Sequence, residues 1–546
     1  MSEKANIAEF LPEMAARQPD ATAILCPWGK RTSRLRYREL EERTNRIARG
    51  LETVGIGRGV RTVLMVPPGL DLFALAFALF KAGAVPVLVD PGIGLEHLKR
   101  CLGRAEPEAF IGVPKAHAAR TLLGWARDTV RTSVTVGRRW FWGGHTLDEL
   151  ETRGAAAKAQ TMAPTDADDV AAIVFTSGST GPPKGVVYRH RNFNAQVAAI
   201  RDAYGIEPGE VNLPTFPLFA LFDPALGMTT VVPDMDPTRP ARVDPRKIVG
   251  PILEHGVTIM FGSPALLDSV GRWGAARGVK LETVRHVISA GAPVAPRIIE
   301  RFQSLLPAGA AIHTPYGATE SLPVATTSSR EILAETRHAT DRGAGTCVGA
   351  PVPSIEAAVI GISDEVIPEW SDDLRLPVGE VGEIVVKGPQ VTGEYFNAPR
   401  HTALAKIADG AALRHRMGDL GYFDERGRLW FCGRLSQRVE TANGLLFTVP
   451  CEAVFNTHPE VFRTALVGIG ERGRQLPVLC VELEKEVPRR ARARVRDELL
   501  ALGAGFAHTC TIRTVLFHPG FPVDIRHNAK IGYGALAAWA ARRVRR

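Results

Sequence analysis

The chain of 546 residues is 45% hydrophobic and 23% charged, a balance that excludes a disordered or fibrous protein and allows several domains. Its net charge of +9 is modest for this length, and the densest basic run, residues 489–496, holds no aromatic residue. Nucleic-acid binders usually combine basic stripes with stacking aromatic residues, so we expect no nucleic-acid partner.

Cysteine usage and the N-terminus indicate the compartment. The seven cysteines are scattered and never spaced as CxxC, which predicts a reducing compartment without a disulfide framework or zinc site. The first twenty residues mix acids and bases and lack the apolar core of a signal peptide. The apolar stretch 72–89 contains Lys81, Gly83 and Pro86, so we predict a buried helix and then a strand. We expect a cytoplasmic protein with at most peripheral membrane contact.

The elements in chain order predict an α/β fold. Leu40, Thr44, Ile47 and Leu51 recur at helical spacing, and Gly55 follows as a stop signal. Short apolar runs then alternate with helical stretches, which indicates a parallel sheet covered by helices. The predicted strands are 62–66, 85–89, 170–175, 257–261 and 286–289, and a helix is predicted over 295–306.

The pattern changes past about residue 380. Hairpin-like strands are predicted over 382–387 and 427–432. Strands over 465–468, 478–483 and 511–517 then alternate with a helix near 490–502. We therefore predict a large N-terminal domain with helix-covered sheets, residues 1–435, and a small α+β C-terminal domain, residues 436–546.

Residues 174–185, VFTSGSTGPPKG, carry the clearest functional signal. A predicted strand runs into small and hydroxylated residues, two prolines and Lys184. Glycine and serine leave backbone N–H groups free for a phosphate, hydroxyls add donors and lysine adds charge, so we predict a phosphate-binding loop. It is not a Walker A loop, because Pro183 stands where that motif needs glycine.

Two weaker patterns are interpreted structurally. Residues 468–473 match G-x-G-x-x-G, but a strand follows instead of a helix, so we predict a hairpin turn and no nicotinamide cofactor. The histidines at 190, 255, 286 and 313 share no metal-ligand spacing and are interpreted as packing or surface residues.

The predicted phosphate loop resembles that of the adenylate-forming superfamily, which includes acyl-CoA synthetases, luciferases and peptide-synthetase adenylation domains. Further segments resemble its landmarks in the expected order. They are 289–293 and 316–320 for adenine, 417–419 for ribose, 433–434 for the hinge and 521–530 for the C-terminal catalytic lysine. The likeness spans Arg36 to the C-terminus and implies the adenylate-forming fold with a mobile C-terminal domain.

The resemblance also implies the chemistry. Members join a carboxylate to the α-phosphate of ATP, which gives an acyl-AMP and pyrophosphate. Glu320 would hold Mg²⁺, Lys530 would bridge the carboxylate and the α-phosphate, and Thr319 would join them as a catalytic residue. The nucleotide would be held by Thr176, Ser177, Gly178, Ser179, Thr180, Gly181, Lys184, Gly291, Ala292, Pro293, Tyr316, Gly317, Ala318, Asp419 and Arg434.

Four places depart from the superfamily's usual residues and narrow the choice of subfamily. One is Ala220, where many members carry a gating histidine. The others are residues 188–191 after the phosphate loop, 435–438 at the hinge and 523–529 before Lys530. They argue against coenzyme A as second substrate. Together they resemble the β-lactone synthetases of bacterial long-chain olefin biosynthesis, and we hypothesise that Ala220 makes room for an α-alkyl chain.

That resemblance implies a long-chain 2-alkyl-3-hydroxy acid as substrate, adenylated and then closed to a β-lactone by its own 3-hydroxyl. It also implies a β-lactone decarboxylase and an NADPH-dependent reductase as partners, in one assembly. The alternative is a long-chain fatty acyl-CoA or acyl-carrier-protein ligase. A degenerate, non-catalytic member is disfavoured because Glu320, Asp419 and Lys530 are all present.

Overall fold

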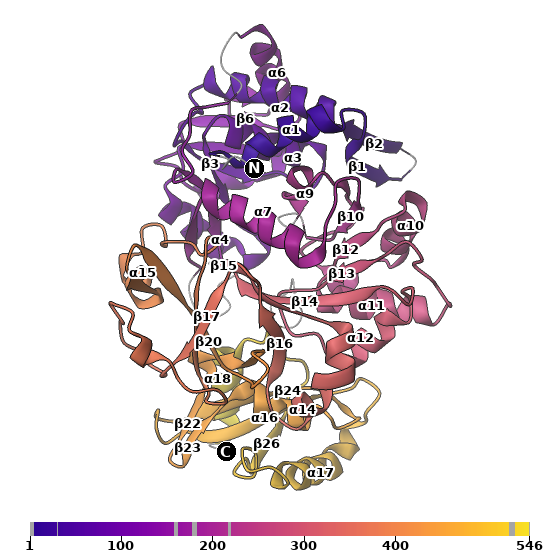
Figure 1. The fold of residues 1–546 in the computed structure, drawn as a ribbon, viewed down its shortest axis with the longest axis vertical. Helices are drawn as coiled ribbons and strands as arrows, with labels where there is room; N and C mark the ends of the chain where they lie inside the picture. Colours follow the sequence, from indigo (N-terminus) through magenta and orange to yellow (C-terminus); the bar gives the residue numbers. More distant parts are fainter. Residues whose placement is uncertain are drawn as a thin grey trace.

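The computed structural model describes residues 5–29, 31–157, 162–176, 183–216, 220–523 and 530–544. Within these residues the strands form two large sheets and two small ones. The small sheets belong to the C-terminal part, drawn in orange to yellow at the bottom of Figure 1. The prediction of an α/β chain ending in a smaller α+β part is confirmed.

A seven-stranded sheet organises the first part of the chain. All its pairings are parallel except that of β8 with β9. Val63 and Leu64 join hydrophobic clusters on opposite faces, as expected for a parallel sheet covered on both sides. In spatial order the strands are β7 (His145–Thr146), β6 (Thr132–Thr135), β5 (Ala109–Gly112), β3 (Arg61–Met65), β4 (Val85–Leu88), β8 (Val170–Phe175) and β9 (Gly185–Arg189).

Helices α2 (Tyr37–Glu52), α3 (Leu70–Lys81) and α6 (Leu147–Ala156) cover one face of this sheet. Helices α4 (Leu95–Ala105) and α5 (Pro114–Leu123) cover the other. The buried Lys81 ends α3 and donates to Glu41 Oε2 and Asn45 Oδ1, both at 2.6 Å. The predicted buried helix followed by a strand is therefore confirmed. Among the described residues, no helix has the length and apolarity needed to cross a bilayer.

The larger sheet of fourteen strands is mixed. From β1 to β14 its pairings are parallel, and from β14 to β17 they are antiparallel. In spatial order the strands are β17 (Glu356–Ile360), β18 (Gly382–Lys387), β20 (Ala412–Phe423), β21 (Leu429–Arg434), β16 (Thr346–Pro351), β15 (Ser321–Ser328), β14 (Ala311–Ala318), β13 (His286–Ile288), β12 (Ile259–Phe261), β10 (Val211–Pro214), β11 (Thr229–Val231), β1 (Thr22–Trp28) and β2 (Arg31–Arg36), with β19 (Lys406–Asp409) paired to β20.

Strand prediction succeeds here with small end shifts. The 257–261 strand begins only at Ile259, because the Val257 N–H bonds back to Ile252 O at the end of α10. The 427–432 strand runs from Leu429 to Arg434, because the Gly427 N–H closes a turn onto Asp424 O. His286 and His313 pair as neighbours on β13 and β14, with Nδ1 and Nε2 3.0 Å apart. The helices of this region are α1 (Phe10–Arg17), α7 (His190–Tyr204), α9 (Asp223–Leu226), α10 (Arg246–His255), α11 (Pro264–Ala275), α12 (Pro296–Gln303), α13 (Ser329–Glu331), α14 (Arg337–Asp341) and α15 (Pro399–Ala405).

The C-terminal part has its own hydrophobic clusters. Strands β24 (Val461–Ile469) and β25 (Leu476–Leu483) form a hairpin, which confirms the predicted turn at 468–473. The strand predicted over 511–517 starts later, at Thr514. The other elements are β22 (Val439–Thr441), β23 (Gly444–Leu446), β26 (Thr514–Phe517), α16 (Thr448–Phe455), α17 (Arg492–Ala504) and α18 (Tyr533–Val544). The exact domain boundary at 435/436 stays a prediction.

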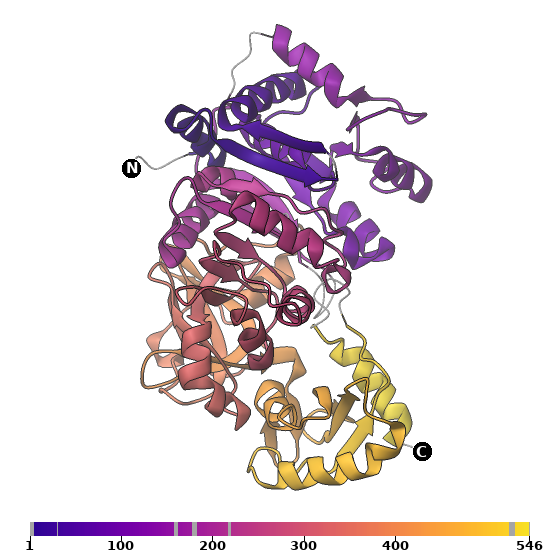
Figure 2. The same cartoon turned by 90° about the vertical axis from the view of Figure 1, so that its right-hand side faces the viewer.

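Ion pairs fasten the C-terminal part to the preceding body. Asp364 contacts Arg438 at 2.5 Å and Arg472 at 3.1 Å, and Arg297 contacts Glu484 at 3.2 Å. Figure 2 shows the C-terminal part, in yellow, below the body with its upper end against the middle of the molecule. This placement brings Lys530 to the wall of the large cavity described next.

Candidate active site

A cavity of about 1380 Å³ lies where the two large sheets and the C-terminal part meet. The predicted residues Ser177, Gly178, Ser179, Thr180 and Gly181 lie outside the described residues. Each of the other predicted site residues lines this cavity: Thr176, Lys184, Gly291, Ala292, Pro293, Tyr316, Gly317, Ala318, Thr319, Glu320, Asp419, Arg434 and Lys530.

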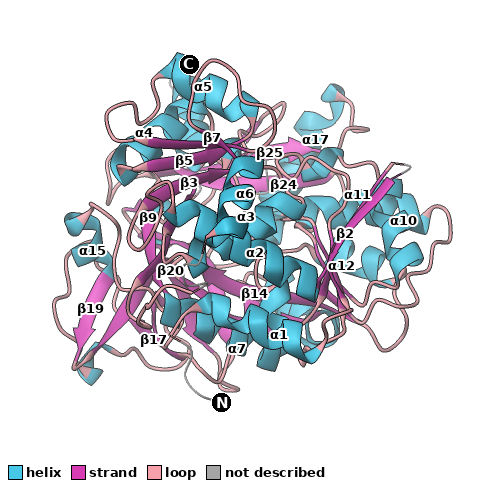
Figure 3. Cartoon of the chain, turned by 90° about the horizontal axis from the view of Figure 1, so that it is seen from above, coloured by secondary structure: helices cyan, strands magenta, loops and turns pink. Residues whose placement is uncertain are grey.

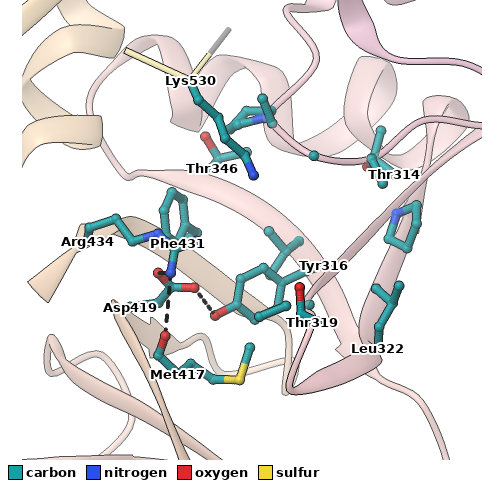
Figure 4. A pocket seen from close by; sticks show the side chains of 18 of the residues that line it. Thr314, Tyr316, Thr319, Leu322, Thr346, Met417, Asp419, Phe431, Arg434 and Lys530 are labelled. Atoms are coloured by element: carbon teal, nitrogen blue, oxygen red, sulfur yellow. Dashed lines mark hydrogen bonds and ion pairs between the residues drawn. The ribbon is translucent and has the colours of Figure 1, made fainter. Parts of the chain in front are cut away.

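Tyr316, Asp419 and Arg434 form one polar cluster, seen in Figure 4. The Tyr316 hydroxyl donates to Asp419 Oδ2 at 2.7 Å, and Arg434 Nη1 lies 3.0 Å from Asp419 Oδ1. Burial raises the pKa of Asp419 above its ordinary value, and the neighbouring Arg434 opposes that shift. A carboxylate has about four lone-pair sites, so Asp419 keeps acceptor capacity for the two hydroxyls of a ribose.

Glu320 lies at the turn between β14 and β15 and is held by a tyrosine. The Tyr395 hydroxyl donates to Glu320 Oε1 at 2.5 Å. Lys184 Nζ lies 4.8 Å from the centre of the Tyr395 ring, and burial lowers the pKa of Lys184, an effect that Glu320 opposes. The N–H of Lys184 also donates to Thr176 Oγ1 at 3.1 Å. Glu320 is therefore fixed by Tyr395 and lies close enough to the Lys184 ammonium to act on its charge.

The 291–293 turn follows β13 at the same edge of the sheet. Gly291 has φ of +95°, a left-handed conformation that favours glycine. Tyr316 stands on neighbouring β14, and its ring centre lies 6.1 Å from that of Phe431. The cavity wall thus combines a glycine turn with two aromatic rings, which suits a planar base.

Lys530 enters from the C-terminal part. Figure 4 shows its side chain pointing into the cavity near Thr346 and toward the Tyr316–Asp419 pair. Its charge lowers the pKa of Asp419. Nearby, Gly433 has φ of +124°, and a Cβ there would lie 2.4 Å from Thr448 Oγ1, so the strand can meet α16 closely only through glycine. The C-terminal part therefore presents its lysine to the nucleotide side of the cavity.

A second part of the cavity wall, called here the acyl end, is apolar. Phe193 stacks on Tyr188 with ring centres 4.6 Å apart and lies 5.8 Å from both Phe80 and Phe222. Gln196 and the backbone carbonyl of Thr319 hydrogen-bond the Tyr188 hydroxyl, which fixes this ring next to the 316–320 segment. The apolar wall is completed by Ile7, Phe77, Leu88 and Leu221.

Ala220 does not line the large cavity among the described residues. It lines a separate space of about 20 Å³ that shares Thr215 and Pro237 with the large cavity wall. This volume holds about one water molecule. The role of Ala220 in making room for an α-alkyl chain stays a prediction, and the described residues show their large apolar space at the aromatic part of the cavity.

Comparison with known proteins agrees with this geometry. Residues 11–396 match the family model described as AMP-binding enzyme. The chain belongs to the AMP-binding enzyme family.

Within that family, it groups with the olefin beta-lactone synthetases. The protein of that name from Xanthomonas campestris pv. campestris is 55% identical over 99% of this chain and 98% of its own length. The one from Stenotrophomonas maltophilia is 54% identical over 99% of both chains. The chain is thus an acyl-adenylate-forming ligase of this group.

A solved structure shares the fold. The amide bond synthetase McbA from Marinactinospora thermotolerans superposes with a TM-score of 0.78 at 22% identity, covering 98% of this chain and 99% of its own. The adenylate-forming fold is therefore confirmed over almost the full length of this AMP-binding enzyme.

Sequence motifs missed several residues of the site. Tyr395, which holds Glu320, comes from a loop far along the chain and carries no local signal. Lys406 is not one of the described residues that line the cavity, but it lies near enough for the charge of Glu320 to raise its pKa; it is buried and donates to the carbonyl of Thr392, and burial lowers its pKa to about 7. Phe431, the aromatic partner of Tyr316, belongs to a strand that sequence patterns describe only as apolar. These residues reach the site through pairings of distant segments.

Proposed function

We propose that this enzyme adenylates a long-chain 2-alkyl-3-hydroxy acid with ATP and then closes it to a β-lactone. The observation that carries the proposal is the 55% identity over nearly the full length to an olefin beta-lactone synthetase. It is supported by a cavity that joins the predicted nucleotide residues to an aromatic, apolar end.

In the first step a carboxylate oxygen of the acid attacks the α-phosphorus of ATP and pyrophosphate leaves. Asp419 would accept the ribose hydroxyls and Tyr316 would face adenine. Lys530 would stabilise the negative charge that develops between the carboxylate and the α-phosphate. Lys184 and Thr176 would face the outer phosphates.

Glu320 fits a magnesium ligand. Its carboxylate lines the cavity, and Mg²⁺ in nucleotide-dependent enzymes is usually held by one or two carboxylates plus substrate phosphates. When bound, the ion would neutralise phosphate charge. The hydrogen bond from Tyr395 keeps the carboxylate aimed at that place.

In the second step the 3-hydroxyl oxygen attacks the acyl carbon, the bond from that carbon to the phosphate oxygen breaks, and AMP leaves while the hydroxyl proton passes to solvent. An intramolecular nucleophile that is held in line with the acyl carbon contributes roughly 7–11 kcal/mol relative to a free one. The apolar end of the cavity, with Phe80, Phe193 and Phe222, would hold the alkyl chains in this geometry.

We propose further that the enzyme works in the cytoplasm with a β-lactone decarboxylase and an NADPH-dependent reductase in one assembly. The scattered spacing of the seven cysteines, none of them as CxxC, supports a reducing compartment.

The test is to incubate the pure protein with ATP, Mg²⁺ and a synthetic 2-alkyl-3-hydroxy fatty acid, with and without coenzyme A. Proton NMR at ambient temperature follows the products, because heating decarboxylates lactones. We expect lactone ring protons and AMP without coenzyme A. Acyl-CoA formed only with coenzyme A would instead make this a long-chain acyl-CoA ligase.

A further inference from the structure

The loop between β6 and β7 presents two aromatic side chains to solvent. Trp140 is 54% exposed and Phe141 is 70% exposed. Both rings pack against Trp142, with centres 5.4 and 5.2 Å away. Trp142 in turn stacks on the buried His117 at 5.3 Å and donates to Thr135 Oγ1 at 2.9 Å. Trp142, fixed by His117 and Thr135, therefore supports the exposed rings of Trp140 and Phe141.

Topology places this loop at the active-site edge of the seven-stranded sheet. Strands β6, β5, β3 and β4 are parallel neighbours, so their C-terminal ends share one edge. Leu88, at the end of β4, lines the large cavity. At about 4.8 Å for each strand step, β6 lies about 14 Å from β4. A further exposed residue at this edge is Leu95, 61% exposed, which begins α4.

The surroundings of these apolar side chains are basic. Figure 3 shows α4 and α5 next to each other, close to β5 and β7. Both helices cover the same face of the sheet, and their positive N-terminal ends lie at this edge. Around this edge, the first half of α4, the start of α5 and the loop 137–144 carry the basic residues Lys99, Arg100, Lys115, Arg138 and Arg139, against the two acids Asp90 and Glu96. Arg139 is paired with Glu149 of α6 at 3.3 Å.

We propose that Leu95, Trp140 and Phe141, called here the apolar rim, dock this enzyme on an anionic lipid surface. A few protruding apolar side chains among basic residues match the chemistry of interfacial binding, in which aromatic rings enter the acyl boundary and cations face anionic headgroups. A protein interface of standard size is instead a broad area with a desolvated centre. The apolar rim lies on the same edge of the seven-stranded sheet as Leu88, which lines the cavity, so docking there would turn this edge toward the lipid that holds a water-insoluble acid.

The test uses the full-length protein without ATP or acid substrate, so its outcome is independent of the reaction proposed above. Flotation with vesicles of phosphatidylcholine alone is compared with vesicles that also contain phosphatidylglycerol. We expect binding to the anionic vesicles that weakens at high salt. The double variant Trp140→Ser, Phe141→Ser should partition at least about tenfold more weakly.

Two further variants sharpen the result. Trp28→Ser, at an exposed aromatic on β1, is the matched control and should bind as the wild type does. Arg138→Glu should weaken binding to anionic vesicles, and thermal unfolding checks that each variant is folded. Equal vesicle binding by the wild type and the double variant, or no binding by the wild type, would overturn the proposal. So would a double variant that binds vesicles normally but no longer associates with the pathway's decarboxylase.

Discussion

The two ends of the large cavity are built in different ways. At the nucleotide end, a few polar atoms are fixed by hydrogen bonds and ion pairs, such as Tyr316 and Arg434 on Asp419. At the acyl end, rings from α3, α7 and the start of α9 pack by shape alone. Polar chemistry restricts which residue types can serve at a position, whereas an apolar wall accepts many residues of suitable size. The nucleotide end therefore leaves motifs in the sequence, and the acyl end does not.

The largest effect is expected at the nucleotide end. Lys530→Ala should slow pyrophosphate release about a hundredfold, roughly 3 kcal/mol, because a charge that develops during transfer loses its partner. Lys485→Ala, at an exposed lysine of the C-terminal part, is the control and should leave the rate unchanged. A Lys530→Ala rate close to wild type would remove this lysine from the mechanism.

A smaller effect on ATP binding is expected at Asp419. Asp419→Asn should raise the KM for ATP about tenfold or more, because charge-assisted hydrogen bonds to ribose and the Arg434 pairing are both lost. Tyr316→Phe keeps the ring and removes only the hydroxyl that donates to Asp419, so it should raise this KM by about fivefold at most. Steady-state kinetics with varied ATP measure both values. The assignment fails if the two variants bind ATP as the wild type does.

A substitution at the acyl end should change the KM for the acid and leave the KM for ATP unchanged. Phe80→Trp adds volume to the aromatic cluster and should raise the KM for long-chain acids by about fivefold, while the KM for ATP stays constant. A parallel series with shorter acids is the internal control, since these need less of the apolar end. A change in the KM for ATP without one for the acid would show that the two ends are not separate.

The smallest effect is one on stability, at Glu452. This carboxyl accepts hydrogen bonds from the Tyr533 hydroxyl at 2.8 and 3.0 Å, three residues after Lys530, and burial raises its pKa to about 8. The folded protein holds this proton more tightly than the unfolded chain, so its contribution to stability is complete below the ordinary pKa of the group and is lost as pH rises through about 8.

Denaturant unfolding at several pH values measures this loss. Glu452→Gln cannot lose a proton, so its free energy of unfolding should fall less than that of the wild type between slightly acidic and alkaline pH. Parallel pH profiles for the two proteins would show that Glu452 does not titrate in this way.

Much of the fold could be predicted, because the spacing of hydrophobic residues along the chain follows from which faces of its helices and strands are buried. The 170–175 and 382–387 strands match the structure at both ends, and the 468–473 turn follows from a strand on each side. The predicted starts at 257 and 511 were wrong by two and three residues, because the strands begin at Ile259 and Thr514. Local apolarity does not say where hydrogen-bonded pairing begins.

Some residues of the site could be predicted from the sequence and others could not. Tyr316, Asp419 and Lys530 could be predicted from motifs, and they line one cavity. Tyr395, which holds Glu320, and Ile7, which closes the apolar wall, could not be predicted, because only tertiary pairing of distant segments brings them there. The hypothesis that Ala220 makes room for an alkyl chain stays a prediction; among the described residues Ala220 lines a space of about 20 Å³.

The most direct test of the central claim follows oxygen atoms through one turnover. The acid is synthesised with ¹⁸O at both carboxylate oxygens and incubated with enzyme and ATP in the absence of coenzyme A. The masses of AMP and of the lactone are then measured by mass spectrometry. Activation of the carboxylate followed by attack of the 3-hydroxyl predicts one ¹⁸O in AMP and one in the lactone carbonyl. A lactone that keeps both labelled oxygens, with unlabelled AMP, would contradict the account, because the hydroxyl would then have been the activated group.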